Sequence, residues 1–141
     1  MPRPPAASTL YKLIEAGQLA RQALLAPLAA RGLEAGDDAI LLALETPEGE
    51  PLPAIEEMTG LSGPPLDAML ARLEDKGLLL RLAVGPEMEP GARLSQQGQA
   101  MRQGIADHWA VLEEALTEQL GRKDRKTLRA GLKSIIGLLG R

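Results

Sequence analysis

The chain has 141 residues, of which 45% are hydrophobic and 25% charged, a composition typical of a single globular domain spanning residues 1–141. Its 16 Lys and Arg against 19 Asp and Glu give a net charge of −3, which excludes a basic surface spread over the whole chain. The absence of cysteine, with His108 as the one histidine, excludes disulfides, thiol catalysis and metal sites that need thiolates or two imidazoles. We therefore predict no metal and no cofactor.

Membrane insertion and secretion are also not expected. The sequence has no apolar run of about 20 residues, and its first ten residues lack the apolar segment of a signal peptide. These features predict a cytoplasmic protein with no membrane partner.

The first predicted helix follows a proline-rich tail, residues 1–7, and is capped by Ser8 or Thr9. Its apolar residues recur every three or four positions as far as Leu28, which indicates one buried stripe. Pro27 is expected to kink or end this helix.

Three shorter helices are predicted next. Asp37 and Asp38 follow Gly36 as a break and a cap, with their carboxylates solvated, before a helix over residues 40–44. Residues 48–51 are predicted as a loop and residues 52–58 as the second of these helices. Ser62 is a plausible cap for the third, which stops at Lys76 and Gly77.

A β-hairpin and two further helices complete the chain. Residues 78–84 and 92–94 are predicted strands, and residues 85–91 have the turn chemistry of a hairpin tip. Ser95 caps a long helix that Gly121 breaks, and Asp124 is the expected cap of the last helix.

This order of elements predicts a mainly α fold with a small β-hairpin, that is, a winged helix-turn-helix over about residues 34–98. Residues 8–33 and 99–141, here called the arms, carry apolar faces that this centre is too small to cover, which favours a two-fold homodimer. The residues expected to mediate dimerisation are Leu10, Leu13, Ile14, Leu128, Leu132, Ile135, Ile136 and Leu139.

Four stretches, in this order and spacing, resemble the MarR family of transcriptional regulators. They are residues 28–44 (LAARGL followed by AILLAL), 55–62 (IEEMTGLS), 70–78 (LARLEDKGL) and 94–98 (LSQQG). The resemblance runs from about Leu10 to Leu139. It implies a homodimer whose recognition helices enter successive major grooves of duplex DNA, with the hairpins on the minor groove or backbone.

The recognition surface departs from the family pattern. Where the family usually has Ser, Thr or Arg, this chain has Pro64, Pro65, Asp67 and Ala68, which offer no forked hydrogen-bond donor to a base. An Asp-x-Arg pair of the family hairpin is replaced by Pro86 and Met88. The candidate DNA-binding residues are Ser62, Pro64, Pro65, Asp67, Ala68, Arg72, Lys76, Arg81 and Arg93. For Arg72, an ion pair with Glu74, Asp75 or a neighbouring helix is equally compatible with the sequence.

Charge is distributed unevenly along the chain. Residues 34–93 hold four basic and 13 acidic side chains, a net of −9, whereas the segments before and after them are each at +3. Because counterion release from phosphates supplies much of the affinity for DNA, this segment predicts weakened or unusual DNA recognition. The basic run of residues 122–133 either touches the DNA backbone or is a solvated face of an arm.

Two functions therefore remain open. The first is a dimeric DNA-binding regulator with weakened or unusual DNA recognition. The second is a winged-helix protein that no longer reads DNA and binds a protein partner through its acidic face. Response to a small aromatic effector, bound in a cleft that the family resemblance places between arms and centre, is compatible with either function. The candidate cleft residues are Tyr11, Ile105, His108, Trp109 and Leu112, although Trp109 could simply fill the core. Enzyme function is not expected, because no nucleophile–base pair or phosphate-binding glycine loop is present.

Overall fold

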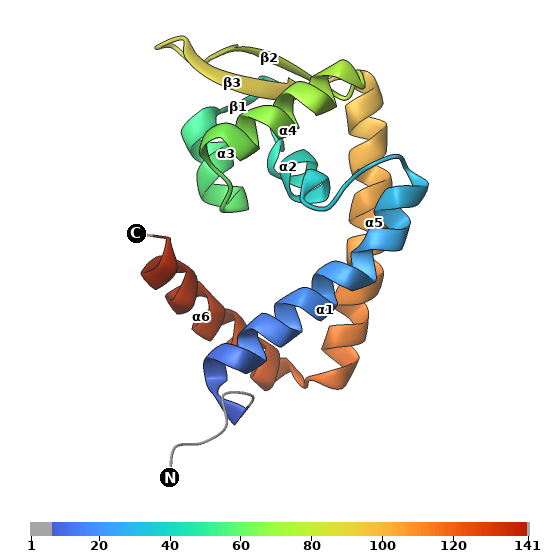
Figure 1. Cartoon of the computed structure of the whole chain (residues 1–141), viewed down its shortest axis with the longest axis vertical. Helices are drawn as coiled ribbons and strands as arrows, with labels where there is room; N and C mark the ends of the chain where they lie inside the picture. Colours follow the sequence, from blue (N-terminus) through green and yellow to red (C-terminus); the bar gives the residue numbers. More distant parts are fainter. Residues whose placement is uncertain (1–6, 141) are drawn as a thin grey trace.

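The computed structural model describes residues 7–140, which form the helices and strands drawn in Figure 1. Helix α1 (Thr9–Ala30) is capped by Ser8, whose hydroxyl accepts a hydrogen bond from the Tyr11 amide at 3.1 Å. The helix continues through Pro27 to Ala30, so the prediction that the proline could end it is wrong. Burial of Leu24 and Leu28 on either side of the proline stabilises this last turn. All of the predicted tail except Ala7 lies outside the described residues.

Helices α2 (Asp37–Ala43), α3 (Leu52–Thr59) and α4 (Gly63–Asp75) form the helix-turn-helix part of the molecule. The cap of α2 is Gly36, in the left-handed conformation with φ of 93°, so the aspartates that follow it lie in the first turn and not at the cap. Ser62 occupies the cap position of α4 as predicted, but its side chain makes no capping hydrogen bond.

The β-sheet has three antiparallel strands in the order β1 (Glu50–Pro51), β3 (Glu89–Leu94) and β2 (Leu79–Val84). The predicted loop over residues 48–51 thus contains a strand, and the return strand begins at Glu89 instead of residue 92. The tip is shorter than predicted because the Met88 amide already bonds the Gly85 carbonyl at 3.1 Å. Gly91 belongs to β3, where a β-carbon would collide with the Glu50 carbonyl, so this glycine permits the third strand.

The core lies where α1, α2, α3, α4, the sheet and the first half of α5 (Gln96–Gln119) meet. Ile40, Leu41, Ile55, Leu73 and Leu79 are completely buried there. Helix α6 (Arg122–Leu139) is capped by Gly121, which corrects the prediction that Asp124 is the cap. Asp124 lies in the first turn, where a carboxylate favours the positive end of the helix.

The distal arms extend away from this core. Figure 1 shows α6 turning back from the end of α5, so that the chain has an open shape with α3 and α6 on either side of the opening. No residue of α6 is buried. Among the helices of residues 7–140, none is both long and apolar enough to cross a membrane.

Candidate nucleic-acid interface

The first half of α4 presents a solvent-exposed face. Pro64, Pro65, Asp67 and Ala68 are all exposed, as is Ser62 at the cap, whereas Leu66 on the opposite side is buried. The two prolines are accommodated because the first amides of a helix have no partner within it. This face therefore presents the Ser62 hydroxyl, the Asp67 carboxylate and aliphatic groups, but no guanidinium group.

Arg72, in the second half of α4, is bound within the chain. Its guanidinium forms ion pairs with the buried Asp37 and, at 2.7 Å, with Glu34 in the turn before α2. The structure thus has the ion pair with a neighbouring helix that the sequence left as the alternative for Arg72. Whether this side chain also contacts DNA stays a prediction.

The next two cations are also engaged. The Lys76 ammonium donates to the Gly32 carbonyl, which joins the end of α4 to the turn after α1. Arg81 on β2 pairs with Glu74 at 3.2 Å and, more loosely, with Asp67 at 3.4 Å. The backbone amide of Arg81 donates to the Glu74 carboxylate at 2.7 Å, and this hydrogen bond, aided by the guanidinium, lowers the pKa of Glu74 below its usual value.

Arg93 differs from the other three cations. It is exposed, and no carboxylate of residues 7–140 pairs with it. In the hairpin, Arg93 stands opposite Leu80, whereas Arg81 stands opposite Ala92. Because successive side chains of a strand alternate between faces, Arg81 lies on the face toward α4 and Arg93 on the other face. The structure therefore does not bring the two hairpin cations together.

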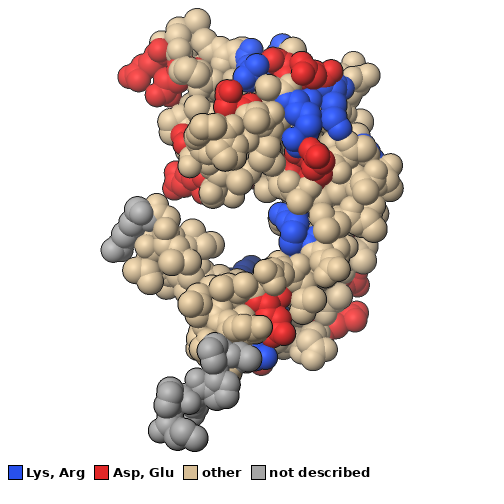
Figure 2. Space-filling view, viewed as in Figure 1, with Lys and Arg blue, Asp and Glu red and all other residues tan. Residues whose placement is uncertain are grey.

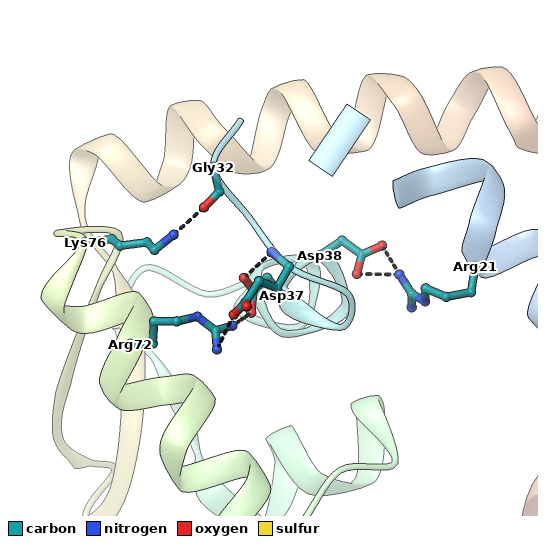
Figure 3. Close-up of polar contacts among 7 residues, drawn as sticks. Arg21, Gly32, Asp37, Asp38, Arg72 and Lys76 are labelled. Carbon is teal, nitrogen blue, oxygen red and sulfur yellow. Dashed lines mark hydrogen bonds and ion pairs between the residues drawn. The ribbon is translucent and has the colours of Figure 1, made fainter. Parts of the chain in front are cut away.

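Two buried aspartates join this region to the arms, as Figure 3 shows. Asp37 and Asp38 are 0% exposed, so the prediction that they are solvated carboxylates is wrong. Asp37 holds Arg72 with one oxygen and accepts from the Glu34 amide at 2.8 Å with the other. Asp38 binds Arg21 of α1 at 2.7 and 2.8 Å. It also accepts a hydrogen bond from the Trp109 indole of α5 at 3.1 Å.

The ion pairs of Asp37 and Asp38 reduce the part of the −9 charge of residues 34–93 that DNA would meet. The charges of Asp37 and Asp38 are compensated inside the protein by guanidinium groups from α4 and α1. The remaining acidic side chains are spread over the loops, α3, α4 and the hairpin, and Figure 2 shows a group of them on the tip of the hairpin, which carries Glu87 and Glu89. Asp37 and Asp38 therefore add little to the repulsion of a polyanion, whereas the exposed carboxylates add to it.

No protein-family model matches the sequence, and no curated protein matches it. Solved structures do. CouR from Rhodococcus jostii RHA1, bound to p-coumaroyl-CoA, superposes with a TM-score of 0.84 at 20% identity, over 95% of each chain. MepR of S. aureus in complex with DNA gives a TM-score of 0.83 at 17% identity, over 96% of this chain and 99% of MepR. A transcriptional repressor named CouR is 27% identical, with a TM-score of 0.76 over 92% of this chain and 93% of its own.

The chain has the fold of MarR-family transcriptional regulators. The predicted winged helix-turn-helix is confirmed. The 27% identical CouR is described as a transcriptional repressor.

In this MarR fold, four of the five candidate cleft residues lie together. Ile105, His108 and Trp109 face Leu24 across a cavity of only about 10 Å³, too small for a ligand. Beside it, Trp109 and Leu112 line a cavity of about 250 Å³ together with Arg21 of α1. Tyr11 lies 13 residues before Leu24, or about 20 Å along α1, and lines none of these cavities.

The residues predicted to mediate dimerisation lie on open surface. Leu10, Ile14, Leu128, Ile136 and Leu139 are between 48% and 69% exposed, and Leu13, Leu132 and Ile135 are partly exposed. The lower half of α5 adds Leu116 to this surface. One chain alone therefore leaves many large apolar side chains of α1, α5 and α6 in water.

Proposed function

We propose that this chain is a dimeric DNA-binding transcriptional regulator. The observation that carries the proposal is the exposed face of α4 beside an exposed hairpin, within a fold that superposes on MepR in its DNA complex over 96% of the chain. In this arrangement α4 enters the major groove and the hairpin lies on the minor groove or against the backbone. The candidate contacts remain Ser62, Pro64, Pro65, Asp67, Ala68, Arg72, Lys76, Arg81 and Arg93.

In this proposal the surface makes few direct hydrogen bonds to DNA bases. Arg72, Lys76 and Arg81 already donate to groups of the protein, so a DNA contact must replace or share those bonds. The exposed aliphatic groups of Pro64, Pro65 and Ala68 can pack against thymine methyl groups. Arg93 is the cation of this region that is ready to neutralise a phosphate.

A fluorescence anisotropy titration against genomic fragments at low salt tests the proposal. We expect micromolar or tighter binding whose affinity falls as salt is raised, because phosphate contacts release counterions. The absence of binding at micromolar protein, or an affinity that is indifferent to salt, overturns it.

Homodimerisation is part of this proposal. The apolar residues of α1 and α6 remain exposed in one chain, and a two-fold partner that offers the same surface covers them. Sedimentation at micromolar concentration distinguishes a dimer from a monomer. A dimer also places two copies of α4 on one face, as two half-sites require.

The protein also responds, in this proposal, to a small aromatic ligand. The 250 Å³ cavity beside Trp109 is mainly apolar, which suits an aromatic ligand, and Arg21, whose guanidinium is held by Asp38, is among its lining residues. Trp109 is the only tryptophan, so quenching of its fluorescence by salicylate-like compounds reports binding. A flat titration to millimolar ligand overturns this part of the proposal.

A second candidate function is a protein-binding module. The observation that favours it is the hairpin tip, where Glu87, Met88 and Glu89 are all exposed. These side chains suit a basic protein partner better than a phosphate backbone. Partner capture by the wild type that the double substitution Glu87→Lys and Glu89→Lys abolishes supports this function, and indifference to the charge reversal removes it.

A further inference from the structure

A cavity of about 340 Å³ lies between α5 and the loop that joins α2 to β1. It shares no lining residue with the exposed face of α4 or with the cavities beside Trp109. Its apolar lining comes from Pro47 and from two buried leucines, Leu44 and Leu94. Its volume is within the range of small-molecule sites in proteins.

The α5 side of this cavity carries one cation. Arg102 is half-buried and donates one hydrogen bond, at 3.0 Å, to the Leu42 carbonyl, which fixes its position against α2. No carboxylate of the described chain pairs with it. Gln99 and Gln103 line the cavity with Arg102, because residues three and four apart share one helix face. This wall is suited to bind a carboxylate.

The opposite side carries one anion. Glu45 lies in the loop after α2, lines the same cavity, and forms no ion pair within residues 7–140. Glu45 and Arg102 thus line one cavity without closing it by a bond to each other. A simple anion would meet Glu45, and a simple cation would meet Arg102, so each is disfavoured.

We infer that this cavity binds a free amino acid, or a zwitterion of similar size, with its carboxylate on Arg102 and its ammonium on Glu45. The glutamine amides of α5 provide further hydrogen bonds, and the aliphatic part of the ligand lies against Leu44 and Leu94. The site does not depend on DNA binding, so its failure is distinguishable from failure of the proposed function.

Isothermal titration of the full chain with the standard L-amino acids, followed by derivatives of the tightest binder, tests this inference. We expect at least one amino acid to bind in the millimolar range or tighter. Its N-acetyl derivative, which has no ammonium, and its amide, which has no carboxylate, should each bind about tenfold more weakly or worse, because each loses a charge-assisted hydrogen bond.

Substitutions test the separate roles of Glu45 and Arg102. Glu45→Gln should weaken the parent amino acid about tenfold but leave the weak binding of the N-acetyl derivative unchanged. Arg102→Gln should also weaken the parent amino acid about tenfold but leave the weak binding of the amide derivative unchanged. The matched control is Glu48→Gln, an exposed carboxylate of the same loop that does not line the cavity. Because Arg102 also joins α5 to α2, the Glu45 series supports or refutes the inference even where Arg102→Gln impairs folding.

Three results overturn the inference. They are no binding of any standard amino acid at millimolar concentration, undiminished binding of the N-acetyl derivative, and equal effects of Glu45→Gln and Glu48→Gln.

Discussion

The winged-helix centre and the arms use their polar and apolar groups in opposite ways. In the centre, Arg72, Lys76 and Arg81 all bind groups of the same chain, and leucines and isoleucines close one core. In α6, no side chain is buried, and none of its cations forms an ion pair with residues 7–140. The centre is thus completed by its own chain, whereas the arms expose the surface that a second copy would cover.

The boundary between the two regions is the aspartate pair. Asp37 faces the centre through Arg72 of α4, and Asp38 faces the arms through Arg21 and Trp109. Because the two residues are adjacent in the first turn of α2, this turn is bonded to α4 on one side and to α1 and α5 on the other. The two buried carboxylates are tolerated because Arg72 and Arg21 compensate their charges and Trp109 donates a further hydrogen bond to Asp38.

The largest effect is expected where the arms are incomplete. Ile136→Asp places a carboxylate in the apolar surface of α6, twice in a symmetric dimer, and should weaken dimerisation by at least about a thousandfold. Sedimentation equilibrium measures the dissociation constant. Far-ultraviolet circular dichroism should remain unchanged, because Ile136 is 67% exposed in the single chain.

The matched control for this substitution is Leu80→Asp. Leu80 is an exposed apolar residue of the hairpin, 43% exposed, and lies outside the arms. It should leave the dimer intact. Equal loss of dimer in both variants would contradict the division into a centre whose core is closed within one chain and arms that need a second copy.

The second effect concerns the boundary itself. Asp38→Asn removes the charge that faces Arg21 while keeping a hydrogen-bond acceptor for Trp109, and should cost about 2–3 kcal/mol of unfolding free energy, less than a fully buried pair because Arg21 is 36% exposed. Urea unfolding measured by circular dichroism gives this value. Asp67→Asn is the control, since that 77% exposed carboxylate should contribute at most about 0.5 kcal/mol. Similar losses of unfolding free energy in both variants would contradict a specific stabilising role for the Asp38–Arg21 pair.

The sequence predicted most of the helices because apolar periodicity and caps such as Ser8 and Ser95 are local signals. The sequence-based prediction failed at residues whose structure depends on tertiary contacts. The strand at Glu50 and Pro51 exists because Gly91, far along the chain, permits a close approach. Likewise, Asp37 and Asp38 resemble ordinary helix-start carboxylates until Arg72 and Arg21 are placed beside them. One feature of the sequence could have predicted these ion pairs. Two consecutive aspartates in an apolar segment, with no cation close to them in sequence, need cationic partners from other parts of the chain.

The third effect separates the two hairpin cations. Arg93→Gln should lower the salt dependence of DNA binding by about one unit in the slope of log affinity against log salt, because one phosphate contact is lost. Arg81→Gln should change this slope less, since Arg81 is engaged by Glu74 and Asp67. Anisotropy titrations at several salt concentrations give both slopes. A larger change for Arg81→Gln would mean that DNA draws this side chain away from α4.

The smallest effect is a pH dependence at the contact between α4 and the hairpin. The Arg81 amide and guanidinium hold the pKa of Glu74 below the usual value of about 4.3, so the unfolded chain takes up a proton there more readily than the folded one. The stability that this carboxylate contributes is therefore fully present above that usual value and is lost as the pH falls through the lower pKa of the folded state. Glu74→Gln should be slightly less stable than the wild type at neutral pH, and the difference should shrink on acidification. Urea unfolding at pH 7 and below pH 4 measures both differences, and a constant difference would show that Glu74 acts through its shape and not through its charge.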